Sequence, residues 1–205
     1  MSNIYILRQL IKEFLNLFHG IRLIKKLPRS PVTIFGSAAL TEKSIYMKQA
    51  HELAHKFVEK RIPTLTGGGS GIMEAAQRGA SHLEVSVIST IGIKIPGVKQ
   101  YDCCGVKHIT MNSIFTRKWL LINYSVGFVV FPGGFGTVNE FTEVITLIQL
   151  GILKKVPVIL VGNEYWKNFI AWLEECSIKE GIIKPESLKL FIIVDNIEEV
   201  ISKFT

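Results

Sequence analysis

Two hydrophobic patterns alternate along the chain. Short apolar runs predict buried strands, and longer segments with apolar residues at helical spacing predict helices. Strands are expected at residues 32–35, 64–66, 126–131, 156–161 and 190–194, with two more near residues 85–91 and His108. Helices are expected at residues 42–60, 71–81, 115–123, from the turn after Phe131 to Leu150, and at residues 165–175 and 197–204. This alternation predicts an α/β fold with a parallel sheet and helices on both faces.

The first segment predicts an amphipathic helix, whose apolar positions are Ile4, Leu7, Leu10, Ile11, Phe14, Leu15, Phe18 and Ile21. Charges such as Arg8, Lys12 and Glu13 interrupt it, so it does not read as a signal peptide. Its basic flank permits binding to a membrane surface, but docking of the apolar face on the domain or on a second subunit is the preferred interpretation. We expect residues 1–30 to pack on the domain or on a partner subunit. Residues 31–205 would form a single nucleotide-binding catalytic domain.

Glycine-rich turns follow two of the predicted strands. Residues 67–71 read Gly-Gly-Gly-Ser-Gly, and residues 131–140 read Phe-Pro-Gly-Gly-Phe-Gly-Thr-Val-Asn-Glu. Such turns let a ligand approach the backbone, and the N–H groups at a helix start attract phosphate. Neither turn ends in the lysine of a phosphate loop, and neither fits the dinucleotide fingerprint. With Gly36 after the first strand, the three turns are expected to share one crevice that binds a phosphorylated small molecule.

Glu140 is the main candidate for chemistry. Thr137 followed by Glu140 also matches a helix capping box, which is the purely structural alternative. The preceding glycines favour an active-site carboxylate in the first helical turn, kept ionised by the helix dipole. Glu143, one turn later, is either a second site carboxylate or a surface charge. Arg117-Lys118, taken alone, reads as a solvent-exposed basic pair.

Other candidate motifs carry less weight. His51-Glu52-Leu53-Ala54-His55 matches a zinc-protease pattern, but the helical phase places both histidines beside charged residues and no third ligand follows, so we expect no metal site. Cys103, Cys104 and Cys176 fit neither a disulfide framework nor a metal site and are expected to be free thiols. Tyr165, Trp166 and Trp172 are expected to be packing residues.

Composition limits the class of protein. The chain has 205 residues and no linker-like composition break, which favours one domain. No apolar stretch approaches the roughly 20 residues that span a bilayer, so a cytoplasmic protein without a membrane partner is expected. The formal charge of +7 comes from dispersed basic residues. It is better explained by anionic metabolites than by nucleic acid.

Four segments, residues 35–38, 66–76, 115–118 and 132–140, together resemble the Lonely Guy (LOG) family, long described as "lysine decarboxylase-like". The motif Pro-Gly-Gly-x-Gly-Thr-x-x-Glu with Arg117-Lys118 upstream is specific, and the resemblance extends over nearly all of the chain after residue 30. It looks like a longer-type member. No pyridoxal-phosphate lysine signature supports a decarboxylase.

The resemblance implies a Rossmann-like homo-oligomer that hydrolyses nucleoside 5'-monophosphates, AMP or N6-modified AMP such as cytokinin ribotides, to free base and ribose 5-phosphate without metal or organic cofactor. It maps the catalytic pair onto Arg117 and Glu140. The substrate-binding residues that it implies are Ser37, Gly68, Gly69, Ser70, Gly71, Met73, Lys118, Gly133, Gly134, Phe135, Gly136, Thr137 and Glu143. Departures at Ala39, Ser70, Trp119 and residues 96–104 leave the preferred base open. The alternative is a non-catalytic nucleotide or molybdenum-cofactor carrier on the same fold.

Overall fold

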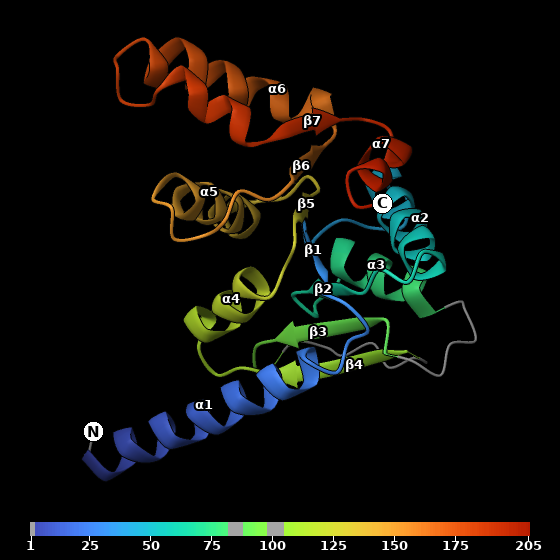
Figure 1. Cartoon of the computed structure of the whole chain (residues 1–205), viewed down its shortest axis with the longest axis vertical. Coiled ribbons are helices and arrows are strands. Elements are labelled where there is room, and N and C mark those ends of the chain that lie inside the picture. Colours follow the sequence, from blue (N-terminus) through green and yellow to red (C-terminus); the bar gives the residue numbers. More distant parts are fainter. Residues whose placement is uncertain (1–2, 82–87, 98–104) are drawn as a thin grey trace.

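A computed structural model describes residues 3–81, 88–97 and 105–205. Within these ranges, a seven-stranded, wholly parallel sheet has the order β4-β3-β2-β1-β5-β6-β7 (Figure 1). The strands are β1 (Val32–Phe35), β2 (Thr64–Thr66), β3 (Thr90–Lys94), β4 (Val106–Thr110), β5 (Phe128–Val130), β6 (Val158–Val161) and β7 (Ile192–Val194). The helices are α1 (Asn3–Ile24), α2 (Ile45–Glu59), α3 (Ile72–Ser81), α4 (Ile114–Asn123), α5 (Phe135–Gln149), α6 (Asn163–Trp172) and α7 (Ile197–Ser202). The predicted α/β fold is therefore confirmed.

The direction in which strands are added reverses at β1. The first strand pairs with β2 on one side, through Thr33 and Leu65, and with β5 on the other, through Thr33 and Phe128. In open parallel sheets, the carboxyl ends of the strands at such a reversal diverge and leave room for a ligand. The turns after β1, β2 and β5 therefore meet at the place where a ligand site is expected.

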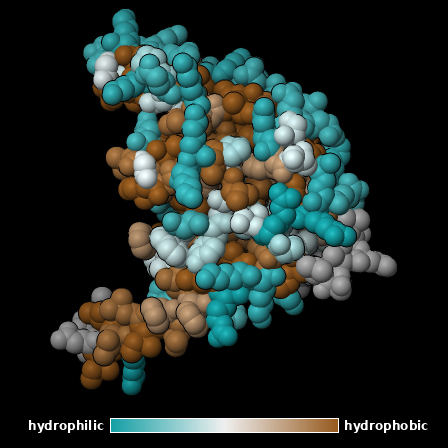
Figure 2. Space-filling model, in the orientation of Figure 1, coloured by the Kyte–Doolittle hydropathy of each residue, from teal (hydrophilic) through white to brown (hydrophobic). Residues whose placement is uncertain are grey.

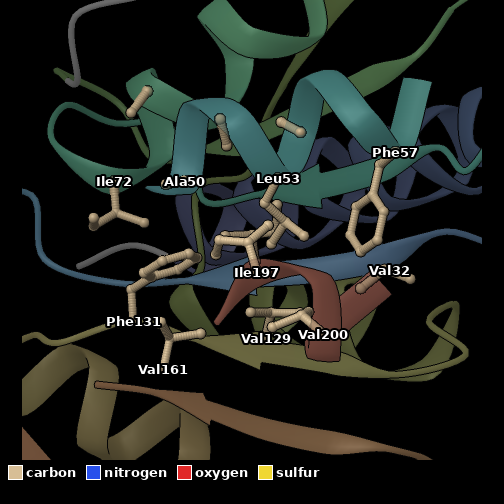
Figure 3. Close-up of a cluster of buried hydrophobic side chains, with 14 of the residues drawn as sticks. Val32, Ala50, Leu53, Phe57, Ile72, Val129, Phe131, Val161, Ile197 and Val200 are labelled. Carbon is tan, nitrogen blue, oxygen red and sulfur yellow. The ribbon is translucent and has the colours of Figure 1, made fainter. Parts of the chain in front are cut away.

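Side chains of the central strands alternate between the two faces of the sheet and contribute to a hydrophobic core on each face. Val32 and Ile34 of β1 join Val129 of β5 under α2, α3 and α7, in the cluster that Figure 3 shows. Phe35 and Phe128 face the opposite side, where their rings stack 5.9 Å apart beneath α4 and α5. Because the sheet is covered on both faces, the strands β1, β2, β5 and β6 are buried at every position.

Several boundaries differ from the sequence prediction. The helix predicted at residues 42–60 begins at Ile45, because the hydroxyl of Ser44 accepts the N–H of Tyr46 and caps it. The strand predicted at residues 85–91 is β3, which starts at Thr90; residues 82–87 lie outside the described ranges. A π-helical segment, Leu173–Ile178, continues α6, and a 3₁₀ helix, Pro185–Leu190, was not predicted. Cys103 and Cys104 also lie outside the described residues.

The helix α1 extends beyond the body of the domain (Figure 1). Its C-terminal turns pack on the second core through Leu17, Ile21 and Ile24. Gly20 is buried so closely that an added Cβ would lie 2.8 Å from Leu120. Earlier turns expose large apolar side chains, as Figure 2 also shows, namely Ile4, Tyr5, Ile6, Leu7, Leu10, Ile11, Phe14, Leu15 and Phe18. Within the described part of the chain, none of the helices has the length and apolar composition that crossing a membrane requires.

Candidate active site

Backbone hydrogen bonds tie the three glycine-rich turns together. The N–H of Ser37, after β1, donates to the carbonyl of Pro132, after β5, at 3.0 Å. The carbonyl of Ser37 in turn accepts the N–H of Ile72 at 3.0 Å, at the start of α3. Gly71 has a φ of 63°, and a Cβ there would lie 2.2 Å from the carbonyl oxygen of Ser37. Close backbone contact therefore requires glycine at this turn, as the sequence pattern indicated.

The start of α5 differs from the predicted capping box. The N-cap is Gly134, which makes no side-chain capping bond, and Thr137 is the third helical residue. Thr137 is buried because its side chain fills the space beside Gly133, where a Cβ would lie 2.2 Å from its Oγ1. Glu140 consequently lies in the second turn rather than the first. The first N–H groups of α5 point out of the helix at the end of β5, a suitable place for an anion.

Arg117 of α4 and Glu140 of α5 form an ion pair beside the turns after β1, β2 and β5. Arg117 Nη1 lies 3.3 Å from Glu140 Oε1, and both side chains are nearly buried, with exposed fractions of 13% and 12%. The guanidinium is also held by two backbone carbonyls: Nε donates to Ile93 at 2.7 Å and Nη2 to Gly67 at 3.4 Å. This anchoring from β3 and from the turn after β2 leaves the Glu140 carboxylate facing a fixed positive charge.

Burial has the largest effect on the pKa of Glu140. It raises the pKa of this carboxyl to about 6, although Arg117 and Lys118 pull the pKa down while Glu143 raises it. The sequence-based expectation that the helix end would keep the carboxylate ionised is therefore incomplete, because desolvation is the largest effect. At pH 7 a group with this pKa is ionised in roughly nine molecules of ten, yet it can still exchange a proton near neutral pH.

Lys118 and Glu143 extend this charged cluster along the same two helices. Lys118 Nζ donates to Glu143 Oε2 at 2.5 Å and to Asn139 Oδ1 at 3.0 Å. The side chain of Lys118 is 15% exposed, so the interpretation of Arg117-Lys118 as a solvent-exposed basic pair is wrong. Asn139 was not singled out from the sequence, because an asparagine in a helix carries no distinctive pattern.

The remaining predicted residues lie in the turns beside the Arg117–Glu140 pair. Gly68 and Gly69 are buried in the turn after β2, whereas Ser70 is exposed and its hydroxyl donates to the carbonyl of Ala38 at 2.8 Å. Met73 lies near Arg117, since a Cβ on Gly67 would meet both side chains. At the tip of the turn after β5, Gly134, Phe135 and Gly136 are exposed, and Phe135 is 97% exposed.

Two structural residues of the site escaped the sequence analysis. A Cβ on Gly67 would lie 1.9 Å from Arg117 Nη2, so the guanidinium occupies the space that any side chain at residue 67 would fill. Tyr165, expected only to pack, donates its hydroxyl to the carbonyl of Gly133 at 2.5 Å and so supports the turn after β5. The buried Trp166 does pack, with Phe141 and Phe169 as neighbours.

The zinc-like motif lies on α2. His55 faces Glu59, with Nε2 3.5 Å from the carboxylate. The backbone of His51 is in close contact with α3, where a Cβ on Gly79 would lie 2.0 Å from its carbonyl oxygen. Across residues 3–81, 88–97 and 105–205, no group of three or more His, Cys, Asp or Glu side chains is arranged to hold a metal ion.

Relatives of known name extend over most of the chain. The probable cytokinin riboside 5'-monophosphate phosphoribohydrolase LOGL9 of Oryza sativa subsp. japonica is 30% identical over 84% of this chain and 76% of its own. The cytokinin riboside 5'-monophosphate phosphoribohydrolase LOG7 of Arabidopsis thaliana is 28% identical over 83% and 78% of the two chains. The enzyme of that function from Rhodococcoides fascians is 27% identical over 85% and 88%.

Solved structures show the same fold at lower identity. The molybdenum cofactor binding protein from Rippkaea orientalis superposes with a TM-score of 0.61 at 22% identity, covering 85% of this chain and 95% of its own. The molybdenum cofactor carrier protein from Chlamydomonas reinhardtii has a TM-score of 0.59 at 22% identity over the same shares. These likenesses establish the Rossmann-like fold.

A family model described as "Possible lysine decarboxylase" matches residues 73–204, which include α4, α5 and the Arg117–Glu140 pair. The resemblance drawn from the glycine-rich motifs is thereby confirmed. The chain belongs to this family, the Lonely Guy (LOG) family of its phosphoribohydrolase relatives.

Proposed function

We propose that this protein hydrolyses the N-glycosidic bond of nucleoside 5'-monophosphates and releases the free base and ribose 5-phosphate. The observation that carries the proposal is the nearly buried Arg117–Glu140 pair beside the start of α5, at the reversal point of the sheet. An anion-attracting helix end and a poised carboxylate lie next to each other there. A phosphorylated ribose matches both features, because its phosphate and its anomeric carbon are parts of one small molecule.

In this mechanism the 5'-phosphate binds at the N–H groups of Phe135, Gly136 and Thr137, with the turn at Gly68 to Gly71 closing around it. Breaking the bond between ribose and base builds positive charge on the sugar, which an ionised carboxylate stabilises. Glu140 provides that charge and accepts a proton from the attacking water. The base leaves with the electron pair of the broken bond and takes up one proton, so that water is added across the bond. Its pKa of about 6 suits a general base near neutral pH.

Arg117 would hold the Glu140 carboxylate in place and favour its ionised form. Its three partners, Glu140 and the carbonyls of Ile93 and Gly67, fix the guanidinium from separate elements. Lys118 adds positive charge near the phosphate, while Glu143 and Asn139 orient its ammonium group. Ser37, Ser70 and Met73 complete the proposed substrate-binding surface. The reaction requires no metal or organic cofactor.

AMP and N6-modified AMP, such as cytokinin ribotides, are the proposed substrates, since the named relatives act on cytokinin riboside 5'-monophosphates. We also propose that the working form is a homo-oligomer. The apolar outer face of α1 would then be covered by a second subunit, which would remove a large exposed hydrophobic surface from water.

The test is to incubate the purified protein with AMP, isopentenyladenosine monophosphate, adenosine and a panel of other nucleotides, and to measure free base and ribose 5-phosphate by chromatography. We expect base release from monophosphates but not from adenosine, because adenosine lacks the phosphate that the start of α5 binds. Glu140→Gln should abolish turnover and retain nucleotide binding.

Glu59→Gln is the matched control, since Glu59 is an exposed carboxylate at the last residue of α2 and pairs with His55. Its turnover should equal that of the wild type. Unchanged turnover in Glu140→Gln would reject the assignment of the catalytic carboxylate. Saturable nucleotide binding without base release from any substrate would instead favour a nucleotide or cofactor carrier.

A further inference from the structure

Glu13 of α1 contacts the start of α4, about a hundred residues later in the chain. Its Oε2 accepts the N–H of Asn112 at 3.0 Å, and its Oε1 accepts the N–H of Ser113 at 3.2 Å. The hydroxyl of Thr116 also donates to Oε1. One carboxylate from a separate helix therefore collects three donors at the first turn of α4.

One of these donors, the N–H of the N-cap residue Ser113, is a backbone group that a helix start leaves without a partner inside the helix. Ser113 is the N-cap of α4 and accepts the N–H of Phe115 with its own hydroxyl at 3.2 Å. Glu13 adds a second cap from outside the helix. Burial raises the pKa of Glu13, but the hydrogen bonds from Thr116, Asn112 and Ser113 outweigh burial and hold the pKa below its ordinary value. A carboxylate that remains ionised is the best partner for these N–H groups.

The first turn of α4 leads directly to Arg117. The backbone N–H of Arg117 donates to the carbonyl of Ser113 at 3.1 Å, and Thr116 is the preceding residue. Any movement of the turn from Asn112 to Thr116 moves the base of the Arg117 side chain. The guanidinium has little tolerance for such movement, because it must reach Ile93, Gly67 and Glu140 together.

We propose that Glu13 is a positioning residue for Arg117: by fixing the first turn of α4 it sets the distance between the guanidinium and the Glu140 carboxylate. Glu13 itself belongs to α1 and contacts the turn at residues 112–116 rather than Glu140. The inference rests on the proposed function for its effect on turnover. Its geometric part, from Glu13 to the Arg117–Glu140 pair, can be measured without any turnover.

The pKa of Glu140 provides that measurement. The charged groups that act on this carboxyl are Arg117 and Lys118 on α4 and Glu143 on α5. Moving Arg117 away removes part of the attraction that opposes burial, so the pKa of Glu140 should rise above that of the wild type. A residue that merely supported the fold would change the unfolding temperature and leave this pKa unchanged.

The experiment compares wild type, Glu13→Ala, Glu13→Gln and Glu42→Ala. Carbon-13 NMR of protein labelled at glutamate carboxyls follows Glu140 through a pH titration, with Glu140→Gln identifying its signal. In Glu13→Ala we expect a higher Glu140 pKa and, with AMP as substrate, a kcat about tenfold lower with little change in KM, as misplacement of a catalytic group produces. Glu13→Gln keeps one acceptor oxygen, so its Glu140 pKa and its kcat should lie between those of the wild type and of Glu13→Ala.

Glu42→Ala is the matched control, because Glu42 is an exposed carboxylate whose bond to Arg78 lies away from α4. In this variant the pKa of Glu140 and the kcat for AMP should equal those of the wild type. A Glu13→Ala protein with a lower unfolding temperature but an unchanged Glu140 pKa and kcat would overturn the proposal. If Glu13→Ala does not fold, Thr116→Val, which removes one donor, is judged by the same criterion. If the wild type releases no base from AMP, the titration alone decides.

Discussion

Replacing Gly67 with alanine tests the geometry of the Arg117–Glu140 pair most directly. The φ angle of Gly67 is not positive, so an alanine can adopt the same backbone conformation. The new Cβ, however, would lie 1.9 Å from Arg117 Nη2 and 2.6 Å from Met73 Sδ. The methionine can move aside, but the guanidinium is held by two carbonyls and by Glu140. The substitution therefore acts on Arg117 rather than on the turn.

The size of the effect follows from that distance. Carbon and nitrogen atoms in contact lie about 3.5 Å apart, so the guanidinium must move by roughly 1.5 Å. The Arg117–Glu140 contact of 3.3 Å is already long for a hydrogen bond and does not survive such a movement. A hydrogen bond between charged groups contributes about 1.5–3 kcal/mol. We therefore expect kcat/KM to fall roughly ten- to a hundredfold.

The assay is base release from AMP, measured beside the unfolding temperature of each variant. Gly79→Ala is the control for general destabilisation, because its Cβ would meet the backbone of His51 rather than Arg117. Gly79→Ala should lower the unfolding temperature yet keep kcat/KM when assayed below it. A folded Gly67→Ala protein with kcat/KM within about twofold of the wild type would refute the proposed role of the guanidinium.

Three further outcomes are expected. Burial raises the folded-state pKa of Glu140 from 4.5 to about 6, so its proton stabilises the fold at low pH and that stability, about 2 kcal/mol, is lost as pH rises from 4.5 to 7. In urea unfolding, the free energy of unfolding of Glu140→Gln should equal that of the wild type at pH 4.5 and exceed it at pH 7. A difference between the two proteins that does not change with pH would contradict this. Phe14 is 68% exposed, so Phe14→Glu should leave the free energy of unfolding within about 0.5 kcal/mol of the wild type while reducing the assembly mass in analytical ultracentrifugation. Incubation with EDTA should leave base release unchanged, and complete loss would disprove a metal-free mechanism.

Local patterns predicted the framework well. The segments that became β1, β2 and β5 are fully buried, and the turns that follow them meet beside the Arg117–Glu140 pair. Boundaries were less predictable, because capping depends on single side chains such as Ser44. The capping box failed for a related reason: Thr137 and Glu140 have the right spacing, but the helix begins at Phe135, directly after Gly134.

Contacts between distant segments were beyond the reach of a single sequence. Gly67 reads as one more turn glycine, and only the folded chain shows that Arg117, fifty residues later, fills its side-chain space. Glu13 reads as an ordinary surface charge, yet it caps α4. Burial of Glu140 likewise depends on how α4 and α5 approach each other, so the rise of its pKa could not be derived from residue order.

The strand order also constrains how the chain reaches its native state. Strands β1 to β4 come from the first 110 residues and can pair with one another, but β1 keeps one edge open until Phe128–Val130 is available. A buried, apolar strand with an unpaired edge is prone to pair with other chains, and distant pairings form slowly. During synthesis, the first half of this protein therefore exposes the unpaired edge of β1. Its partner β5 is synthesised directly before the turn and the helix α5, which bears Glu140. Pairing of β5 with the open edge of β1 therefore brings Glu140 to its place beside the turns after β1 and β2.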